Sequence, residues 1–253
     1  MKNAWLAVAM VGISLKAHAL GGLADVQVLD RDTGCVLPTY RHQGEYWIAG
    51  RPGARYSIVI HNRGAQRVLA VTAVDGVNVI SGESGAWGQT GYVFDPGQSY
   101  DIPGWRKSQQ EVADFNFTAA SDSYAARTGR PANVGVIGVA LFLEKSPLPA
   151  TIMRFSSRLG QNSAAAESAR AASASAAPKL GTGHGAREAS YVREVEFDRQ
   201  SSTPNEIIRI RYDSLENLIA MGVVDRRQTP WPVPNPFPDS GDPKYVPDPP
   251  GGG

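Results

Sequence analysis

The chain has 253 residues, of which 42% are hydrophobic and 19% are charged. This balance provides enough apolar side chains for a sizeable core and argues against a mostly disordered chain. The 27 glycines and 18 prolines argue against a helical bundle or coiled coil and favour short elements joined by turns. With a formal net charge of only +1, the chain has no overall basic field that would attract nucleic acid.

Residues 1–19 have the pattern of a signal peptide. Lys2 supplies a basic start, residues 4–15 are almost entirely apolar, and Ala17, His18 and Ala19 form an A-x-A cleavage site. This apolar run is too short for a stable transmembrane helix, and no later stretch approaches the ~18 apolar residues expected of a membrane span. We therefore expect an exported protein, periplasmic or secreted, without a membrane span.

Residues 20–159 are predicted to form a β-sandwich domain. Apolar and polar residues alternate near 24–30, 56–61 and 113–118, which indicates half-buried strands. The runs at 68–74 and 134–143 are almost continuously apolar, as in central strands covered on both faces. Turn signals such as Asp75-Gly76 and Asp95-Pro96-Gly97 separate the runs. About seven strands with this spacing predict an antiparallel sandwich, immunoglobulin-like or jelly-roll in topology.

The rest of the chain divides by composition. Residues 160–185 are rich in Ala, Ser and Gly and predict a linker. Residues 186–225 predict a small strand-strand-helix module, with a hairpin from 191–197 and 207–212 and a helix capped by Asp213. Because such a module is too small to be stable alone, we expect it to dock on the sandwich or on a partner. Residues 226–253 predict an extended Pro-rich tail.

The Gly-rich segment 81–106 is the region that most resembles a binding surface. Aromatic faces and polar side chains on a long loop suit a sugar, a peptide or a partner protein, although a tryptophan there could equally plug the open end of the sandwich. Arg106, Arg127 and Arg130 could form a carboxylate-binding cluster if the loops converge. The candidate binding residues are Trp87, Gln89, Tyr92, Trp105, Arg106 and Arg127.

Catalytic and metal-binding signatures are mostly absent, so no cofactor and no metal are expected. The segment Asp30–Gly34 begins like a calcium loop but lacks the later carboxylates, and it predicts a turn. Cys35 is the single cysteine, which excludes an intramolecular disulfide and predicts a small apolar strand residue. The glycines of residues 181–185 predict a close approach of two backbone segments rather than a phosphate-binding loop.

Six segments of the chain form recognisable motifs: Val74–Gly82, Ile102–Ser108, Ser123–Gly129, Asn133–Val139, Gly181–Gly185 and Tyr212–Leu218. Together they resemble an uncharacterised family of exported bacterial β-sandwich proteins. The resemblance covers about two thirds of the chain, brings no known activity or catalytic residue, and supports only the domain limits.

We therefore expect an exported, non-enzymatic binding or structural protein of the bacterial envelope, with a protein or polysaccharide partner. The alternative is a periplasmic or secreted hydrolase that uses the loop carboxylates Glu83, Asp95 and Asp101. A third possibility is self-association through residues 186–225. The sequence leaves the oligomeric state open.

Overall fold

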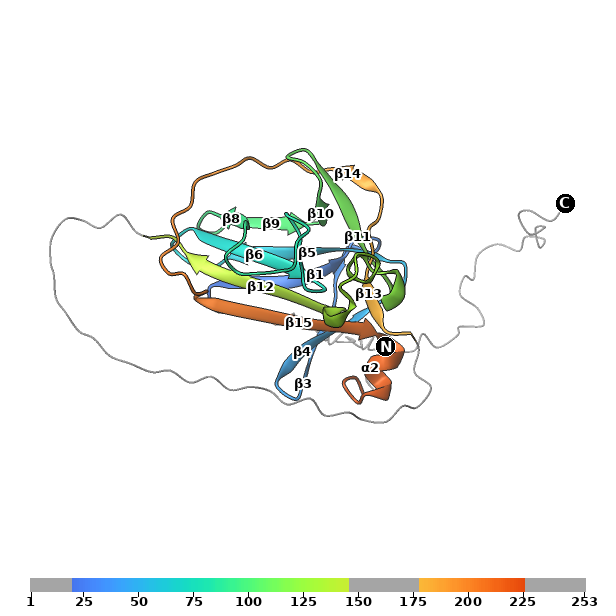
Figure 1. Ribbon diagram of the computed structural model, residues 1–253. Coiled ribbons are helices and arrows are strands. Elements are labelled where there is room, and N and C mark those ends of the chain that lie inside the picture. Colours follow the sequence, from blue (N-terminus) through green and yellow to red (C-terminus); the bar gives the residue numbers. More distant parts are fainter. Residues whose placement is uncertain (1–19, 146–177, 226–253) are drawn as a thin grey trace, which may run out of the picture.

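A computed structural model describes residues 20–145 and 178–225 (Figure 1). The predicted signal peptide, the Pro-rich tail and most of the predicted linker lie outside these residues. Within the two described ranges, none of the helices has the length and apolar character needed to cross a membrane.

Two β-sheets pack against each other, which confirms the predicted β-sandwich fold class (Figure 1). In the first sheet the order is β10-β11-β5-β1-β2, with β13 and β14 also paired to β11 and β9 paired to β5. Its strands are β1 (Ala24–Asp30), β2 (Cys35–Val36), β5 (Arg55–Asn62), β9 (Ser99–Ile102), β10 (Gly104–Arg106), β11 (Glu111–Ala119), β13 (Leu180–Thr182) and β14 (Arg187–Ala189).

The second sheet has the order β3-β4-β15-β12-β6-β7, with β8 also paired to β6. All of its pairs are antiparallel except β4 with β15, which run parallel. Its strands are β3 (Thr39–His42), β4 (Glu45–Gly50), β6 (Val68–Val74), β7 (Val77–Asn78), β8 (Tyr92–Phe94), β12 (Val136–Leu143) and β15 (Glu206–Ser214). The helical turns are η1 (Ala120–Asp122), α1 (Tyr124–Arg127), η2 (Pro131–Asn133) and α2 (Leu215–Ala220).

The alternation expected from the sequence is the alternation of burial in the structure. Along β1 every second residue is buried, and β6 is buried at all but one position, as expected for a strand covered on both faces. Aromatic rings fill the space between the sheets, where Tyr56 stacks on Phe117 with ring centroids 4.4 Å apart. A sheet with one buried face needs such large side chains because its stability comes mainly from apolar burial.

The predicted strand-strand hairpin of residues 186–225 is wrong. Residues 191–197 form no strand, and β15 lies between β4 and β12 as a central strand of the second sheet. The reason is packing: Ile208, Ile210 and Tyr212 alternate with charged residues and are buried in the core that the two sheets share. Leu180–Thr182, which fall in the predicted linker, likewise form β13 on β11. The described part of 178–225 is therefore built into the sandwich rather than appended to it.

A buried polar chain joins these late strands to the earlier ones. Asp75, at the turn between β6 and β7, is fully buried, and one of its oxygens accepts from the Tyr212 hydroxyl at 2.5 Å and from the Gly135 amide at 2.9 Å. The other oxygen accepts from the Thr182 amide at 2.8 Å. Burial raises the pKa of Asp75, and these donors offset part of the increase. The Thr182 hydroxyl also contacts the hydroxyl of Tyr56 at 2.6 Å, so the chain spans both sheets.

Candidate functional site

The segment that replaces the predicted hairpin crosses the side of the sandwich where β8 and β9 lie (Figure 1). We call residues 190–199 the strap and the space beneath it the strap groove. The groove is a cavity of about 790 Å³, within the usual range for ligand pockets. It is lined by β8 and β9, by the loop after β10 and by strap residues 191–195.

The start of the strap is held by side chains from β8 to β10. The Arg106 guanidinium donates to the Ser190 carbonyl at 2.6 Å and to the Tyr92 hydroxyl at 3.2 Å. The Tyr100 and Ser190 hydroxyls are 3.2 Å apart. The Val192 amide donates to the Gln109 carbonyl at 2.8 Å. Because a planar guanidinium has five donors in fixed directions, Arg106 can fix the strap and the Tyr92 ring together.

The end of the strap is held by the Gly-rich loop. The Arg199 guanidinium donates to the carbonyl oxygens of Trp87 at 2.7 Å and Gln89 at 2.6 Å, and it lies 4.4 Å from the centroid of the Phe142 ring. Arg67 pairs with Glu144 and donates to a strap carbonyl. The two ends of the strap are thus anchored, and the middle, which lines the groove, contributes exposed side chains.

Three tyrosines line the groove. Tyr92 and Tyr100 lie with ring centroids 5.9 Å apart, and burial raises the pKa of the Tyr92 hydroxyl. Tyr191, on the strap, is 75% exposed, which is unusual for a large aromatic side chain. The remaining lining mixes short apolar, amide and charged side chains: Arg67, Ile80, Thr90, Gly91, Val93, Phe94, Asp95, Gln98, Arg106, Ser108, Gln109, Val192, Arg193, Glu194 and Val195.

The six predicted binding residues do not form one site. Tyr92 and Arg106 line the strap groove together. Trp87 is 52% exposed and lies with Gln89 in the loop that holds Arg199. The other two lie elsewhere: Trp105 is buried and donates its indole N–H to the Gly183 carbonyl at 2.9 Å, and Arg127 ends α1.

The strap residues were missed because the sequence alternates apolar and charged residues there as an exposed strand would. Tyr191 is 99 positions from Tyr92 in the printed sequence, so no local pattern could bring the two together. Two features of the sequence do indicate a groove: the Gly-rich loop, and the presence of an aromatic residue in both segments, Tyr92 in the loop and Tyr191 in the strap.

The three carboxylates of the hydrolase alternative are dispersed. Of the three, only Asp95 lines the strap groove, where Arg67 pairs with it at 3.3 Å. Glu83 accepts from the Gln89 amide at 3.3 Å, and Asp101 lies on β9 opposite Val59. Within the described residues, no group of three or more His, Cys, Asp or Glu side chains is placed to hold a metal ion.

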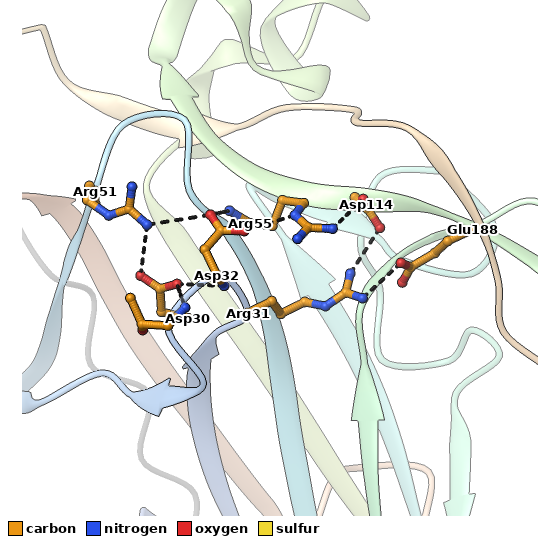
Figure 2. A network of polar contacts seen from close by, with 8 residues as sticks. Asp30, Arg31, Asp32, Arg51, Arg55, Asp114 and Glu188 are labelled. Carbon is orange, nitrogen blue, oxygen red and sulfur yellow. Dashed lines mark hydrogen bonds and ion pairs between the residues drawn. The ribbon is translucent and has the colours of Figure 1, made fainter. Parts of the chain in front are cut away.

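A second polar region lies where β1 ends at Asp30 and β5 begins at Arg55. Carboxylates and arginines alternate there (Figure 2). The Arg31 guanidinium bridges Asp114 at 3.0 Å and Glu188 at 2.8 Å. Burial and the neighbouring Glu188 raise the pKa of Asp114, and Arg31 opposes this effect. Asp30 accepts from the amides of Asp32 and Thr33 at 2.9 and 3.1 Å, as a turn-forming aspartate does. Thus the predicted turn is formed, and its carboxylates are used within the protein.

Cys35 lies on β2 as expected for a strand residue, but its side chain is exposed rather than packed in the core. The glycines of 181–185 serve close packing, as predicted. A Cβ on Gly181 would lie 2.6 Å from the Cβ of Ser123, and one on Gly183 would lie 2.7 Å from Asn116 Oδ1. A larger residue at Gly181 would therefore collide with Ser123 and Val134, and one at Gly183 would collide with Asn116 of β11.

Fold and site together define a β-sandwich protein with a strap-covered groove. No family model, curated protein or solved structure matches the chain. The family resemblance of the sequence segments therefore adds no residue role, and function has to be argued from the groove itself.

Proposed function

We propose that this protein is an exported, non-enzymatic binding protein whose strap groove takes a neutral segment of an envelope polysaccharide. The observation that carries the proposal is a cavity of about 790 Å³ that combines tyrosine rings with two arginines, Arg67 and Arg106, that are already bonded to protein groups. A pocket of this size suits a few sugar units rather than a folded domain.

The aromatic lining favours a ligand with both apolar faces and hydroxyl groups. Tyrosine has an apolar ring face and a hydroxyl that both donates and accepts hydrogen bonds. Pyranose rings present C–H groups on their faces and hydroxyls at their edges, so they match such side chains. Tyr191 is exposed at the strap, and the amides of Gln98 and Gln109 lie in the same lining.

The charges of the groove favour a neutral ligand. Arg106 is already bonded to Tyr92 and Ser190, and Arg67 is paired with Asp95 and Glu144. Drawing either arginine away to an anion would break existing bonds, and the protein group left behind would lose its partner. A ligand without charge needs no such exchange.

The test is binding of the purified full chain to an array of neutral oligosaccharides, followed by calorimetry with the glycan that binds best. Tyr191→Ala should weaken binding about tenfold, since one aromatic contact contributes roughly 1 kcal/mol or a little more. The matched control is Trp87→Ala, which removes another exposed aromatic ring that does not line the groove.

We expect Trp87→Ala to bind within about twofold of the natural sequence, because ΔΔG values below ~0.5 kcal/mol are typical of uninvolved surface positions. An array without any neutral ligand, or equal losses in the two variants, would contradict the proposal. Release of new reducing ends during the incubation would support the hydrolase alternative instead.

A further inference from the structure

Four basic side chains lie near Tyr124, the first residue of α1. Lys107 and His184 lie beside its ring, and Arg127 and Arg187 are close enough to His184 to lower its pKa. We call Lys107, Arg127, His184 and Arg187 the basic cluster. They come from four separate places in the chain: the residue after β10, the last residue of α1, the loop after β13, and the first residue of β14. All four are exposed, and none of them lines the strap groove.

The cluster rests on a rigid aromatic base. The Tyr124 ring lies 4.7 Å from Trp105 and 5.8 Å from His184, measured between ring centroids. The Lys107 ammonium lies 5.8 Å from the centre of the same ring. Trp105 holds the Gly183 carbonyl, so the backbone that presents His184 is fixed to β10. A base of this kind lowers the entropy lost when a ligand binds.

Positive charge accumulates at this place. The pKa of His184 is lowered, first by burial and then by Lys107, with further contributions from Arg187 and Arg127. The pKa of Lys107 is lowered by burial and by Arg187.

Two carboxylates of β11 lie close by, but both are engaged. Glu111 pairs with Arg187 at 3.3 Å, and Asp114 pairs with Arg31 on the other side. Arg127 and Lys107 have no carboxylate among the ion pairs of the described residues. A negatively charged ligand would relieve the mutual repulsion of these cations.

We propose that the basic cluster is a binding site for a tetrahedral oxyanion, a phosphate or sulfate group. Two guanidinium forks, an ammonium and an imidazole supply more donors than the two oxygens of a carboxylate can accept. Phosphate and sulfate groups offer three or four oxygens in different directions, which suits donors that approach from four separate elements. This site is independent of the strap groove, and either proposal can fail without the other.

Sulfate is the probe of choice, because it keeps its charge throughout the pH range in which histidine titrates. We expect saturable binding of sulfate to the full chain at low ionic strength, observed by NMR as a shift of the His184 ring signals. Arg127→Gln should weaken binding about threefold, and the double variant Arg127→Gln/Arg187→Gln about tenfold, as exposed ion pairs contribute 0.2–1 kcal/mol each.

The matched control is Arg209→Gln, which removes the same charge from an exposed position of β15. It should leave the affinity unchanged. An equal loss with Arg209→Gln would show a general charge effect and overturn the site. Acetate binding as tightly as sulfate would overturn the tetrahedral assignment.

Protonated His184 adds a positive charge, so sulfate affinity should rise as the pH falls through the lowered pKa of this residue. His184→Gln should abolish that rise while leaving the affinity at pH 8 within about twofold. A rise that persists in the variant would contradict the part assigned to His184.

The source of the anion is tested by comparing inorganic sulfate with dextran sulfate, and with dextran as the uncharged control. Tighter binding per sulfate by the polymer would identify an ester carried on a polysaccharide, and equal binding would identify a free oxyanion; either result supports the site. Equal binding of uncharged dextran would overturn it.

Discussion

Arg187 and Glu188 are consecutive residues of β14, yet they belong to opposite electrostatic environments. Glu188 joins the network of Figure 2, where Arg31 bridges it to Asp114. Arg187 joins the basic cluster, where it lowers the pKa of His184. Successive side chains of a strand point to opposite faces, so one short strand separates a buried ion-pair network from an exposed group of basic residues. In that group Arg187 pairs with Glu111, whereas Lys107 and Arg127 have no ion pair among the described residues. A count of arginines therefore does not locate a binding site, whereas a local excess of cations over carboxylates does.

The largest effect is expected when the cation of the buried network, Arg31, is removed. Arg31→Met should lower the free energy of unfolding by about 3 kcal/mol at pH 7, because Asp114, whose side chain is only 5% exposed, would face Glu188 without its main partner. Urea denaturation measures the change. Arg127→Met is the control, with an expected change below ~0.5 kcal/mol. Equal stability of the two variants would show that the network of Figure 2 does not hold the sandwich together.

Asp75 is a buried carboxylate whose hydrogen-bond partners are neutral groups rather than arginines. Asp75→Asn should destabilise the fold by about 2 kcal/mol at pH 7. The NH2 group of the asparagine would face the backbone N–H of Thr182 or Gly135, so that two donors would meet where a donor and an acceptor meet now.

The pH dependence follows from the raised pKa of Asp75. In the unfolded chain the Asp75 carboxyl loses its proton near pH 3.9, whereas in the folded chain it keeps the proton to higher pH. The stability that this proton contributes is therefore complete below about pH 3.9, and it is lost as the pH rises through the pKa of Asp75 in the folded protein. The stability difference between the natural sequence and Asp75→Asn should therefore shrink from pH 4 to pH 8 in urea titrations. A constant difference would contradict the raised pKa.

The smallest effect on stability is expected in the basic cluster. Lys107→Gln should raise the pKa of His184, because it removes the cation that lowers that pKa most after burial. Stability should change by less than ~0.5 kcal/mol, since repulsion among exposed charges is weak. An NMR titration of the His184 ring measures the pKa, with Arg209→Gln as the control that leaves it unchanged. A lowered or constant pKa in Lys107→Gln would contradict the crowding of cations.

The fold could be predicted wherever side-chain periodicity reports burial directly. The alternation of β1 and the continuous apolar run of β6 are local patterns with one physical meaning. The apolar run of β12 is different, since its residues mostly alternate between buried and half-buried positions rather than being covered on both faces. The end of α2 is also marked in the sequence, since Gly222 follows it with a φ of 72°, a conformation that favours glycine. Its start was misplaced by one residue: Ser214, not Asp213, accepts the bond from the Asn217 amide. Both side chains can cap a helix, and only the backbone conformation decides between them.

The strap and the late strands could not be predicted in this way. Residues 191–197 alternate as a strand would, but the bonds that hold the strap come from Arg106 and Arg199, and no periodicity encodes them. β13 has only three residues, of which Gly181 is one, and Gly183 follows it, so it has no pattern to detect. Tyr92 and Arg106 could be proposed among six candidate binding residues because both lie in the Gly-rich segment, whereas Tyr191 is brought to the groove only by the tertiary structure.

The parallel pairing of β15 with β4 has a consequence for how the molecule assembles. Until β15 arrives, β4 and β12 present open hydrogen-bonding edges toward each other, and sheet closure depends on the last described strand of the chain. Such distant contacts slow folding and leave edges free to join other chains in the meantime. The strap precedes β15 in the chain, so the groove beneath it forms when β15 inserts between β4 and β12 and closes the sheet. A chain caught before that event would have neither a complete sandwich nor a place to bind.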